Sequence, residues 1–243
     1  MSERNEPAAE PSGEGRAIET RLLAAAVTER LRDMIVEGEL PPGLKLNERV
    51  LCERLRISRT PLREAIKYLA SEGLIDLLPR RGAAVKPITA AAVREMFVVL
   101  EALEQLAGEL ACIHATEGEI AEIRAVHYRM LVHYTRGELA PYFRCNQEIH
   151  MRLVSCAANA TLANTYRSLN AHLRRARYMA NLSRDRWDKA VAEHERILDA
   201  LVNRDGKRLG SLLRSHLENK MQVVLAELEA DEARQAPAGI PAA

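Results

Sequence analysis

Aromatic side chains are scarce in this chain, at 4% of 243 residues, although 47% of the residues are hydrophobic. The cores are therefore expected to be built mainly from aliphatic side chains. No hydrophobic run approaches the roughly twenty residues that a membrane-spanning helix needs. The first residues are polar and acidic, without the hydrophobic segment of a secretory signal. We therefore expect a cytoplasmic protein that has no membrane as a partner.

Paired cysteine motifs are also lacking. Cys52, Cys112, Cys145 and Cys156 lie far apart and show no CxxC spacing. They fall inside helical patterns, so we expect reduced thiols and not a disulfide framework. The charges nearly cancel, with 35 Lys and Arg against 34 Asp and Glu. Any charged binding surface must therefore be local.

The length and the changes of composition along the chain predict two domains, mostly α-helical. Residues 1–17, rich in Glu, Pro, Gly and Ser, are expected to form a disordered tail. Residues 18–87 read as a small N-terminal domain. Residues 88–230 carry long helical patterns with short polar breaks, typical of an antiparallel all-helical bundle. Residues 231–243 are expected to be a flexible tail.

Six helices are predicted in the second domain, and nothing there resembles a strand. Their expected positions are near residues 89–115, 118–136, 139–157, 161–181, 184–203 and 206–230.

The first domain contains two short helical patterns in close succession, preceded by a longer amphipathic helix over about residues 18–36. That first helix is expected to bury Leu22 and Leu23 at the start of its apolar stripe. Asn47 is a favourable N-cap for the second helix, which should bury Val50 and Leu51.

A third helix is expected to begin at Thr60 and Pro61, because proline is tolerated at the first helical position. Arg59, Arg63 and Lys67 recur every four residues and should form a row of positive charge on one face. A short helix that carries its base-reading residues near its N-terminus is typical of a helix-turn-helix in the major groove.

Two short apolar segments, Leu74–Leu78 and Ala83–Lys86, are expected to be the strands of a wing. Arg80 and Arg81 would lie at its tip, over the phosphate backbone or the minor groove. Between Lys45 and Lys86 there are ten Lys or Arg residues and five Asp or Glu residues, in a chain of net charge +1. Such a local basic excess indicates phosphate binding, so we predict a winged helix-turn-helix that binds double-stranded operator DNA.

The motifs SRTPLREA, EGLI and RRGAAV, contiguous over this region, resemble the DNA-binding domain of the GntR family of bacterial transcription regulators. The resemblance places Arg49, Arg59 and Arg63 where the family's arginines contact the operator, and Gly82 at the wing tip. Arginine suits this role because its planar fork can bond guanine O6 and N7 together. The predicted DNA-binding residues are Arg49, Arg59, Thr60, Arg63, Arg80, Arg81 and Gly82.

In the second domain, three predicted helices each direct one histidine toward the interior. His150 lies on the inward face of its helix one turn after Asn146, and His194 and His216 lie on the core sides of two later helices. Each histidine alone is more often a hydrogen-bonded core residue. Three together are what a site for a divalent metal such as zinc or nickel requires. The remaining histidines are expected at the surface or at helix rims.

The segments EALEQLAGELA, EHERILDAL and RSHLEN resemble the FCD effector domain of FadR-like GntR regulators. The resemblance implies a metal held by His150, His194 and His216, with Asn146 where relatives carry an aspartate. A neutral amide leaves the ion its full charge, which favours an anionic ligand. Leu100 stands where many relatives have an arginine, and Arg174, Arg175 and Arg177 are candidates to replace it or are solvated.

These features predict a homodimeric transcription regulator, acting as a repressor, that senses a small carboxylate metabolite beside the metal. No residue is assigned to the effector itself. One alternative is a metal-dependent hydrolase or oxygenase fused to a DNA-binding domain. We expect no enzyme and no catalytic residue, because Glu148 and Glu193 should point away from the histidines and leave no general base. Another alternative is a regulator whose metal is structural or is itself the signal.

Overall fold

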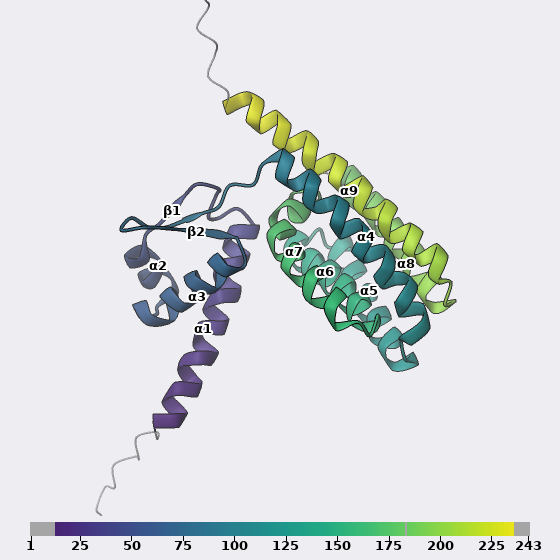
Figure 1. Cartoon of the computed structure of the whole chain (residues 1–243), viewed down its shortest axis with the longest axis horizontal. Coiled ribbons are helices and arrows are strands. Elements are labelled where there is room, and N and C mark those ends of the chain that lie inside the picture. Colours follow the sequence, from purple (N-terminus) through teal and green to yellow (C-terminus); the bar gives the residue numbers. More distant parts are fainter. Residues whose placement is uncertain (1–12, 183, 236–243) are drawn as a thin grey trace, which may run out of the picture. The chain divides into compact units, whose positions relative to one another are not determined.

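The structure is a computed structural model that describes residues 13–182 and 184–235 of the chain. It divides into two compact units, Met1–Lys86 and Pro87–Ala243, which are treated separately below (Figure 1). Two helices extend into the segments expected to be tails, since the first begins at Gly13 and the last ends at Gln235. Ala, Glu and Arg in these segments favour helix. Residues 1–12 and 236–243 of the predicted tails lie outside the described residues.

The first unit is a winged helix-turn-helix. Its elements are α1 (Gly13–Val36), β1 (Lys45–Leu46), α2 (Glu48–Leu55), α3 (Arg59–Ser71), β2 (Ile75–Leu78) and β3 (Gly82–Val85). The strands form one antiparallel sheet in the order β1-β3-β2, with Leu78 paired to Gly82 across the wing turn. The helix-turn-helix and the wing predicted from the sequence are both confirmed.

Local chemistry sets the starts of these helices. The Asn47 side chain accepts hydrogen bonds from the backbone N–H groups of Arg49 and Val50, as an N-cap should. Ser58 occupies the cap position of α3 without a side-chain hydrogen bond, and Pro61 lies in the first turn. The core gathers the inner faces of α1 and α3 against the sheet, with Leu31, Met34, Leu62, Leu69 and Val85 fully or almost fully buried.

Two expectations about this core are wrong. Leu22 and Leu23 are exposed, because the core covers α1 only from Val27 onward. Val50 is also exposed, while its neighbour Leu51 is buried. The cap at Asn47 fixes the phase of α2, so that only one of these two consecutive side chains can face the core.

In its described residues, the second unit is a bundle of six helices, as predicted. They are α4 (Ala90–His114), α5 (Glu117–Thr135), α6 (Leu139–Cys156), α7 (Ala160–Met179), α8 (Arg184–Val202) and α9 (Gly206–Gln235). The long helices α4 and α9 lie side by side (Figure 1). Glycines permit this close approach, since a Cβ at Gly108 would meet Leu213 Cδ1 at 2.7 Å and one at Gly210 would meet the Gln105 carbonyl oxygen at 2.9 Å.

Within the described residues, no helix combines the length and the apolar character that crossing a membrane requires. The four cysteines are free thiols, three of them buried, as expected from their spacing.

Candidate functional site

Three histidines meet inside the bundle. His150 on α6, His194 on α8 and His216 on α9 are each at most 1% exposed. Their ring centroids are 5.2 Å apart for His150 and His194, 5.3 Å for His150 and His216, and 4.8 Å for His194 and His216. One nitrogen from each ring lies within 4.8 Å of the others. Three separate helices therefore bring their imidazoles to one point.

Carboxylates orient two of these rings. Glu104 Oε2 on α4 lies 2.8 Å from His150 Nδ1, and Glu193 Oε2 on α8 lies 2.6 Å from His216 Nδ1. In both rings the opposite nitrogen, Nε2, has no hydrogen-bond partner. A carboxylate on one imidazole nitrogen fixes the tautomer and makes the other nitrogen a better metal ligand.

Asn146 belongs to the same cluster. Its Nδ2 atom lies 2.8 Å from His194 Nε2, and its fully buried Oδ1 atom has no hydrogen-bond partner. The oxygen and nitrogen of an amide exchange places by a half turn of its terminal torsion. Asn146 can therefore present either a donor or a metal-binding oxygen to the cluster.

Burial keeps these imidazoles neutral. It lowers the pKa of His150 to about 4, against the opposing attraction of Glu104. Burial, together with the neighbouring rings and Lys220, also lowers the pKa of His194 and that of His216 well below the usual value. A neutral imidazole is the form that binds a metal ion.

A polar network extends from Glu104 into the bundle. Tyr166 Oη donates to Glu104 Oε1 at 2.8 Å, and Arg177 Nη2 lies 3.4 Å from the same oxygen. Arg177 Nη1 also donates to Tyr166 Oη at 2.9 Å and to Asn170 Oδ1 at 2.6 Å. Burial raises the pKa of Glu104, but His150, Arg177 and these hydrogen bonds outweigh it and hold that pKa well below its usual range. Glu104 is therefore a paired, ionised carboxylate.

A second network holds Glu193. Arg186 Nη2 donates to Glu193 Oε2 at 2.6 Å, and Asn219 Nδ2 donates to Glu193 Oε1 at 2.9 Å. The expectation that Glu193 points away is wrong, because neighbouring elements cover the flank of α8 as well as its central face and the long side chain reaches His216. Glu148 does point outward, where it pairs with Arg129 and Arg152.

The residues present fit a metal ion. Buried atoms of the cluster without a hydrogen-bond partner include His150 Nε2, His194 Nδ1, His216 Nε2 and Asn146 Oδ1. Neutral imidazole nitrogens and an amide oxygen are ligands that zinc or nickel accepts. Glu104 and Glu193 pair with arginines on one side and contact imidazoles on the other, which suits them to orient the rings.

Residues outside this cluster correct one further expectation and decide between two alternatives that the sequence left open. His127 on α5 is buried and not at the surface, and burial lowers its pKa. Arg177 is fully buried on the network of Glu104 and is not solvated, while Leu100 packs in the core. The role of Glu104, which lies among apolar residues of α4, was not predicted from the sequence. The signal that could have found it was its helical phase, which makes it a core position.

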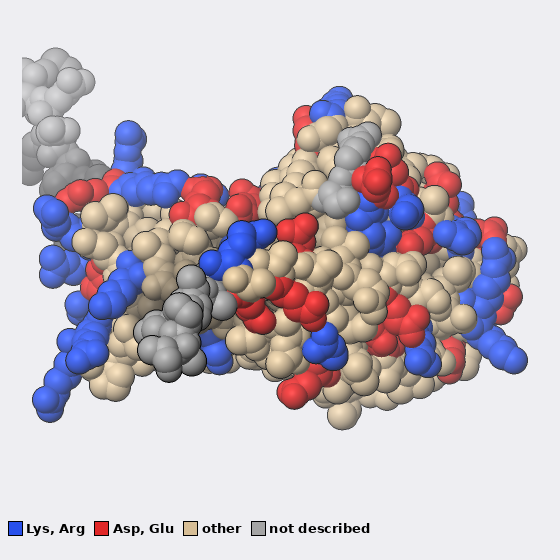
Figure 2. Space-filling model, turned by 90° about the horizontal axis from the view of Figure 1, so that it is seen from above, with Lys and Arg blue, Asp and Glu red and all other residues tan. Residues whose placement is uncertain are grey.

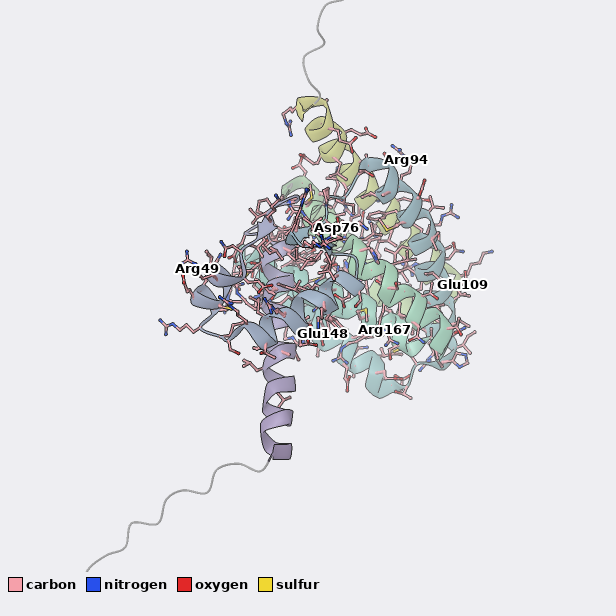
Figure 3. All side chains as sticks on the ribbon, turned by 60° about the vertical axis from the view of Figure 1, so that its left-hand side comes forward. Arg49, Asp76, Arg94, Glu109, Glu148 and Arg167 are labelled. Atoms are coloured by element: carbon pink, nitrogen blue, oxygen red, sulfur yellow. The ribbon has the colours of Figure 1, made fainter. Side chains whose placement is uncertain are left out.

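The first unit presents a basic surface. Arg49, Arg59, Thr60 and Arg63 are all exposed, at the starts of α2 and α3. Lys and Arg side chains predominate on the face of this unit seen at the left of Figure 2, and Arg49 projects outward in Figure 3. Arg63 Nε is 2.8 Å from Glu48 Oε2, an exposed pair that costs little to exchange for a phosphate or a base.

The wing tip is a tight turn. The Arg81 N–H donates to the Leu78 carbonyl at 3.0 Å, and Pro79 begins the corner. Arg80 and Gly82 adopt left-handed backbone, with φ of 58° and 88°. Arg80, Arg81 and Gly82 are exposed, so both guanidinium groups are free to meet a phosphate backbone.

Comparison with known proteins agrees with this architecture. Residues 23–85 match the bacterial regulatory proteins of the gntR family, and residues 95–219 match the FCD domain. The chain belongs to the GntR family of bacterial transcription regulators, with a C-terminal FCD domain. This GntR regulator is a DNA-binding protein, and its family is one of transcription regulators.

Relatives and solved structures extend the comparison. The chain is 29% identical over 197 residues to the Nta operon transcriptional regulator of Aminobacter aminovorans, covering 79% of this chain and 90% of that protein. It is 29% identical over 188 residues to the transcriptional repressor RspR of Escherichia coli, covering 77% of this chain and 82% of that protein. The fold resembles that of E. coli McbR/YncC, with a TM-score of 0.71 and 21% identity over 86% of this chain and 98% of that chain. It also resembles a crystal structure of a GntR transcriptional regulator from Rhodococcus sp. RHA1, with a TM-score of 0.69 and 23% identity over 84% of this chain and 97% of that chain.

Proposed function

We propose that this GntR regulator is a homodimeric repressor whose FCD domain holds a divalent metal ion and binds a small carboxylate metabolite. Binding of the metabolite would weaken the hold of the winged domains on a palindromic operator. The observation that carries the sensing part is the convergence of three neutral, buried imidazoles, two of them oriented by carboxylates. A repressor role is supported by RspR, a relative whose name describes a repressor.

His150, His194 and His216 would hold the ion, with Asn146 as a fourth ligand. When bound, the ion supplies a positive charge that attracts a carboxylate. Three imidazoles and an amide leave that charge uncompensated, because none of the four ligands is ionised. Glu104 and Glu193 would keep the His150 and His216 rings in the orientation that the ion needs.

The winged domain would read DNA through α3. Arg59 and Arg63 lie on its exposed face near its N-terminus, where a recognition helix contacts base edges in the major groove. Arg49 and the wing arginines would contact the phosphate backbone. Two copies of the domain suit a palindromic operator, because the two-fold symmetry of a dimer matches that of its half-sites.

Coupling between the two domains requires that the effector bind two dimer geometries with different affinity. By linkage, operator DNA must then weaken effector binding by the same factor by which the effector weakens operator binding. Measuring both affinities in one preparation would test this reciprocity directly.

The metal site is tested by replacing His194 with alanine and measuring bound metal after loading with zinc. Loss of one ligand should release most of the ion, while His127→Ala, which removes another buried histidine outside the cluster, should leave it bound. Equal zinc content in the His194→Ala variant and the parent would refute the site.

The DNA surface is tested by Arg63→Ala, with an operator found by selection from random duplexes. A direct base contact is worth about 1–3 kcal/mol, so affinity should fall about ten- to a hundredfold. The melting temperature should barely change, because the Arg63–Glu48 pair is exposed. Arg167→Ala, an exposed arginine of the FCD domain, is the control (Figure 3). Unchanged operator affinity in Arg63→Ala would refute this placement of α3.

A further inference from the structure

Among the described residues around the histidine cluster, one buried basic side chain has no partner. Arg177 pairs with Glu104, and Arg186 pairs with Glu193. Lys220 on α9 is the remaining buried cation of this region among the described residues. It is 0% exposed, and its Nζ atom has no hydrogen-bond partner.

Lys220 belongs to the same site as the histidines. It lies four residues after His216, so the two side chains share one face of α9. It lies within electrostatic range of all three imidazoles and of both arginine–glutamate pairs. A lysine at this place in the core is not explained by holding the helices together, because its ammonium group contacts no acceptor in the described part of the chain.

Burial, together with the nearby Arg177 and Arg186, lowers the pKa of Lys220 well below its usual value, because an ammonium group at this place loses its hydration without a compensating interaction. An apolar side chain of similar length would pack at the same position without that cost. A lysine here therefore indicates a counter-ion that the protein itself does not supply.

We propose that Lys220 is the residue that recognises the carboxylate of the effector. This inference rests on the proposed sensing function and adds to it a named anion-binding group that is separate from the metal ligands. A carboxylate fits because it brings the one negative charge that Lys220 lacks and accepts the hydrogen bonds of an ammonium group.

The position of Lys220 also specifies the ligand class. The ion proposed for the imidazoles attracts one anionic or chelating group, and Lys220 attracts another. A ligand that satisfies both has a carboxylate together with a second acidic or oxygen-donor group, as in a dicarboxylate or a hydroxy acid. A neutral isostere such as the diamide should not bind.

The test uses the full, zinc-loaded chain and measures binding of acetate and succinate by calorimetry, with succinamide as the uncharged comparison. In the parent, succinate should bind more tightly than acetate, and succinamide should not bind. Lys220→Met and Lys220→Gln should both lower succinate affinity about ten- to a hundredfold, as loss of a charged hydrogen bond does. Zinc content should stay unchanged. Lys207→Met, on the exposed surface of α9, should bind succinate as the parent does.

A second readout separates recognition from a structural role. Without any acid, Lys220→Met should melt at the same temperature as the parent or higher, because it removes a buried amino group that has no hydrogen-bond partner. A clearly lower melting temperature, rescued in part by glutamine, would show a lysine held by internal hydrogen bonds and would overturn the proposal. Unchanged succinate affinity in both variants would overturn it while leaving the sensing function intact. If the parent binds neither acid, both this proposal and carboxylate sensing fail, whereas DNA binding is unaffected.

Discussion

Replacing Glu193 with glutamine tests whether a carboxylate prepares the metal site. In the structure Glu193 Oε2 contacts His216 Nδ1 and Arg186 Nη2, both at 2.6 Å, and Oε1 accepts from Asn219 at 2.9 Å. Glutamine keeps the size and one acceptor oxygen but removes the charge. The change therefore reaches the metal site through His216 without removing a metal ligand.

Two effects of different size follow. Loss of a carboxylate behind a ligating histidine typically lowers metal affinity about 10- to 100-fold, equivalent to about 1.4–2.7 kcal/mol. Arg186 is buried, and the substitution removes the carboxylate with which it pairs. Breaking a buried ion pair from one side costs about 3–5 kcal/mol, so the zinc-free variant should unfold at clearly lower urea concentration.

The double variant Glu193→Gln/Arg186→Met separates these effects. Removing both charges should restore most of the stability, since neither charge is then left without a partner. Zinc affinity should stay low, because His216 still lacks its carboxylate. Zinc affinity is measured by competition with a chelator, and stability by urea unfolding of the zinc-free protein.

Glu148→Gln is the matched control, because Glu148 pairs with two arginines at the surface of α6. It should leave zinc affinity unchanged and cost no more than about 1 kcal/mol of stability. Parental zinc affinity in Glu193→Gln would refute the role of the carboxylate, and with it the argument that His216 is prepared as a ligand.

Two regions outside the site give further predictions. Glu101 is buried, and burial raises its pKa. The folded chain therefore holds the Glu101 proton more tightly than the unfolded chain does. The free energy of unfolding should fall as the pH rises above about 4.3, the pKa of Glu101 in the unfolded chain. Measured by urea unfolding, Glu101→Gln should therefore gain about 1 kcal/mol of stability at pH 7 and none near pH 4. The exposed control Glu95→Gln should show no such difference between the two pH values. An equal gain of Glu101→Gln at both pH values would contradict the role of burial. Gly210→Ala should lose about 1–3 kcal/mol of stability, because the added Cβ would lie 2.9 Å from the Gln105 carbonyl oxygen. Gly118→Ala should gain about 0.5–1 kcal/mol of stability, because a Cβ there meets nothing nearer than 3.9 Å. Equal effects at the two glycines would contradict the close contact of α4 and α9.

The sequence was sufficient to predict the elements of the fold, because each carries a local signal. Asn47 caps α2, Pro61 marks the start of α3, and polar breaks separate the six bundle helices. The convergence of His150, His194 and His216 also followed from helical phase, since each lies on an apolar stripe.

What the sequence did not reveal is which polar partners meet across helices. Glu104 and Glu193 contact imidazoles on other helices, at sequence separations that no periodicity encodes. Helical phase alone assigned Glu193 to the outward face of α8. Neighbouring helices, however, cover more of the α8 surface than its single apolar stripe. Lys220 was likewise not recognised, because a lysine at a core position conflicts with the general pattern and is explained only by its surroundings.

The charge of the cluster connects these observations. An aspartate at residue 146 would cancel part of the charge of a bound dication, but this chain has an amide there. Glu104 and Glu193 cannot cancel it either, because each already faces an arginine. Lys220, whose Nζ has no partner in the described part of the chain, becomes positive when it takes up a proton. Under the proposed function, metal and effector are then not independent ligands. The positive ion raises the affinity of the site for an acid, and the negative charge of the acid compensates the buried positive charge.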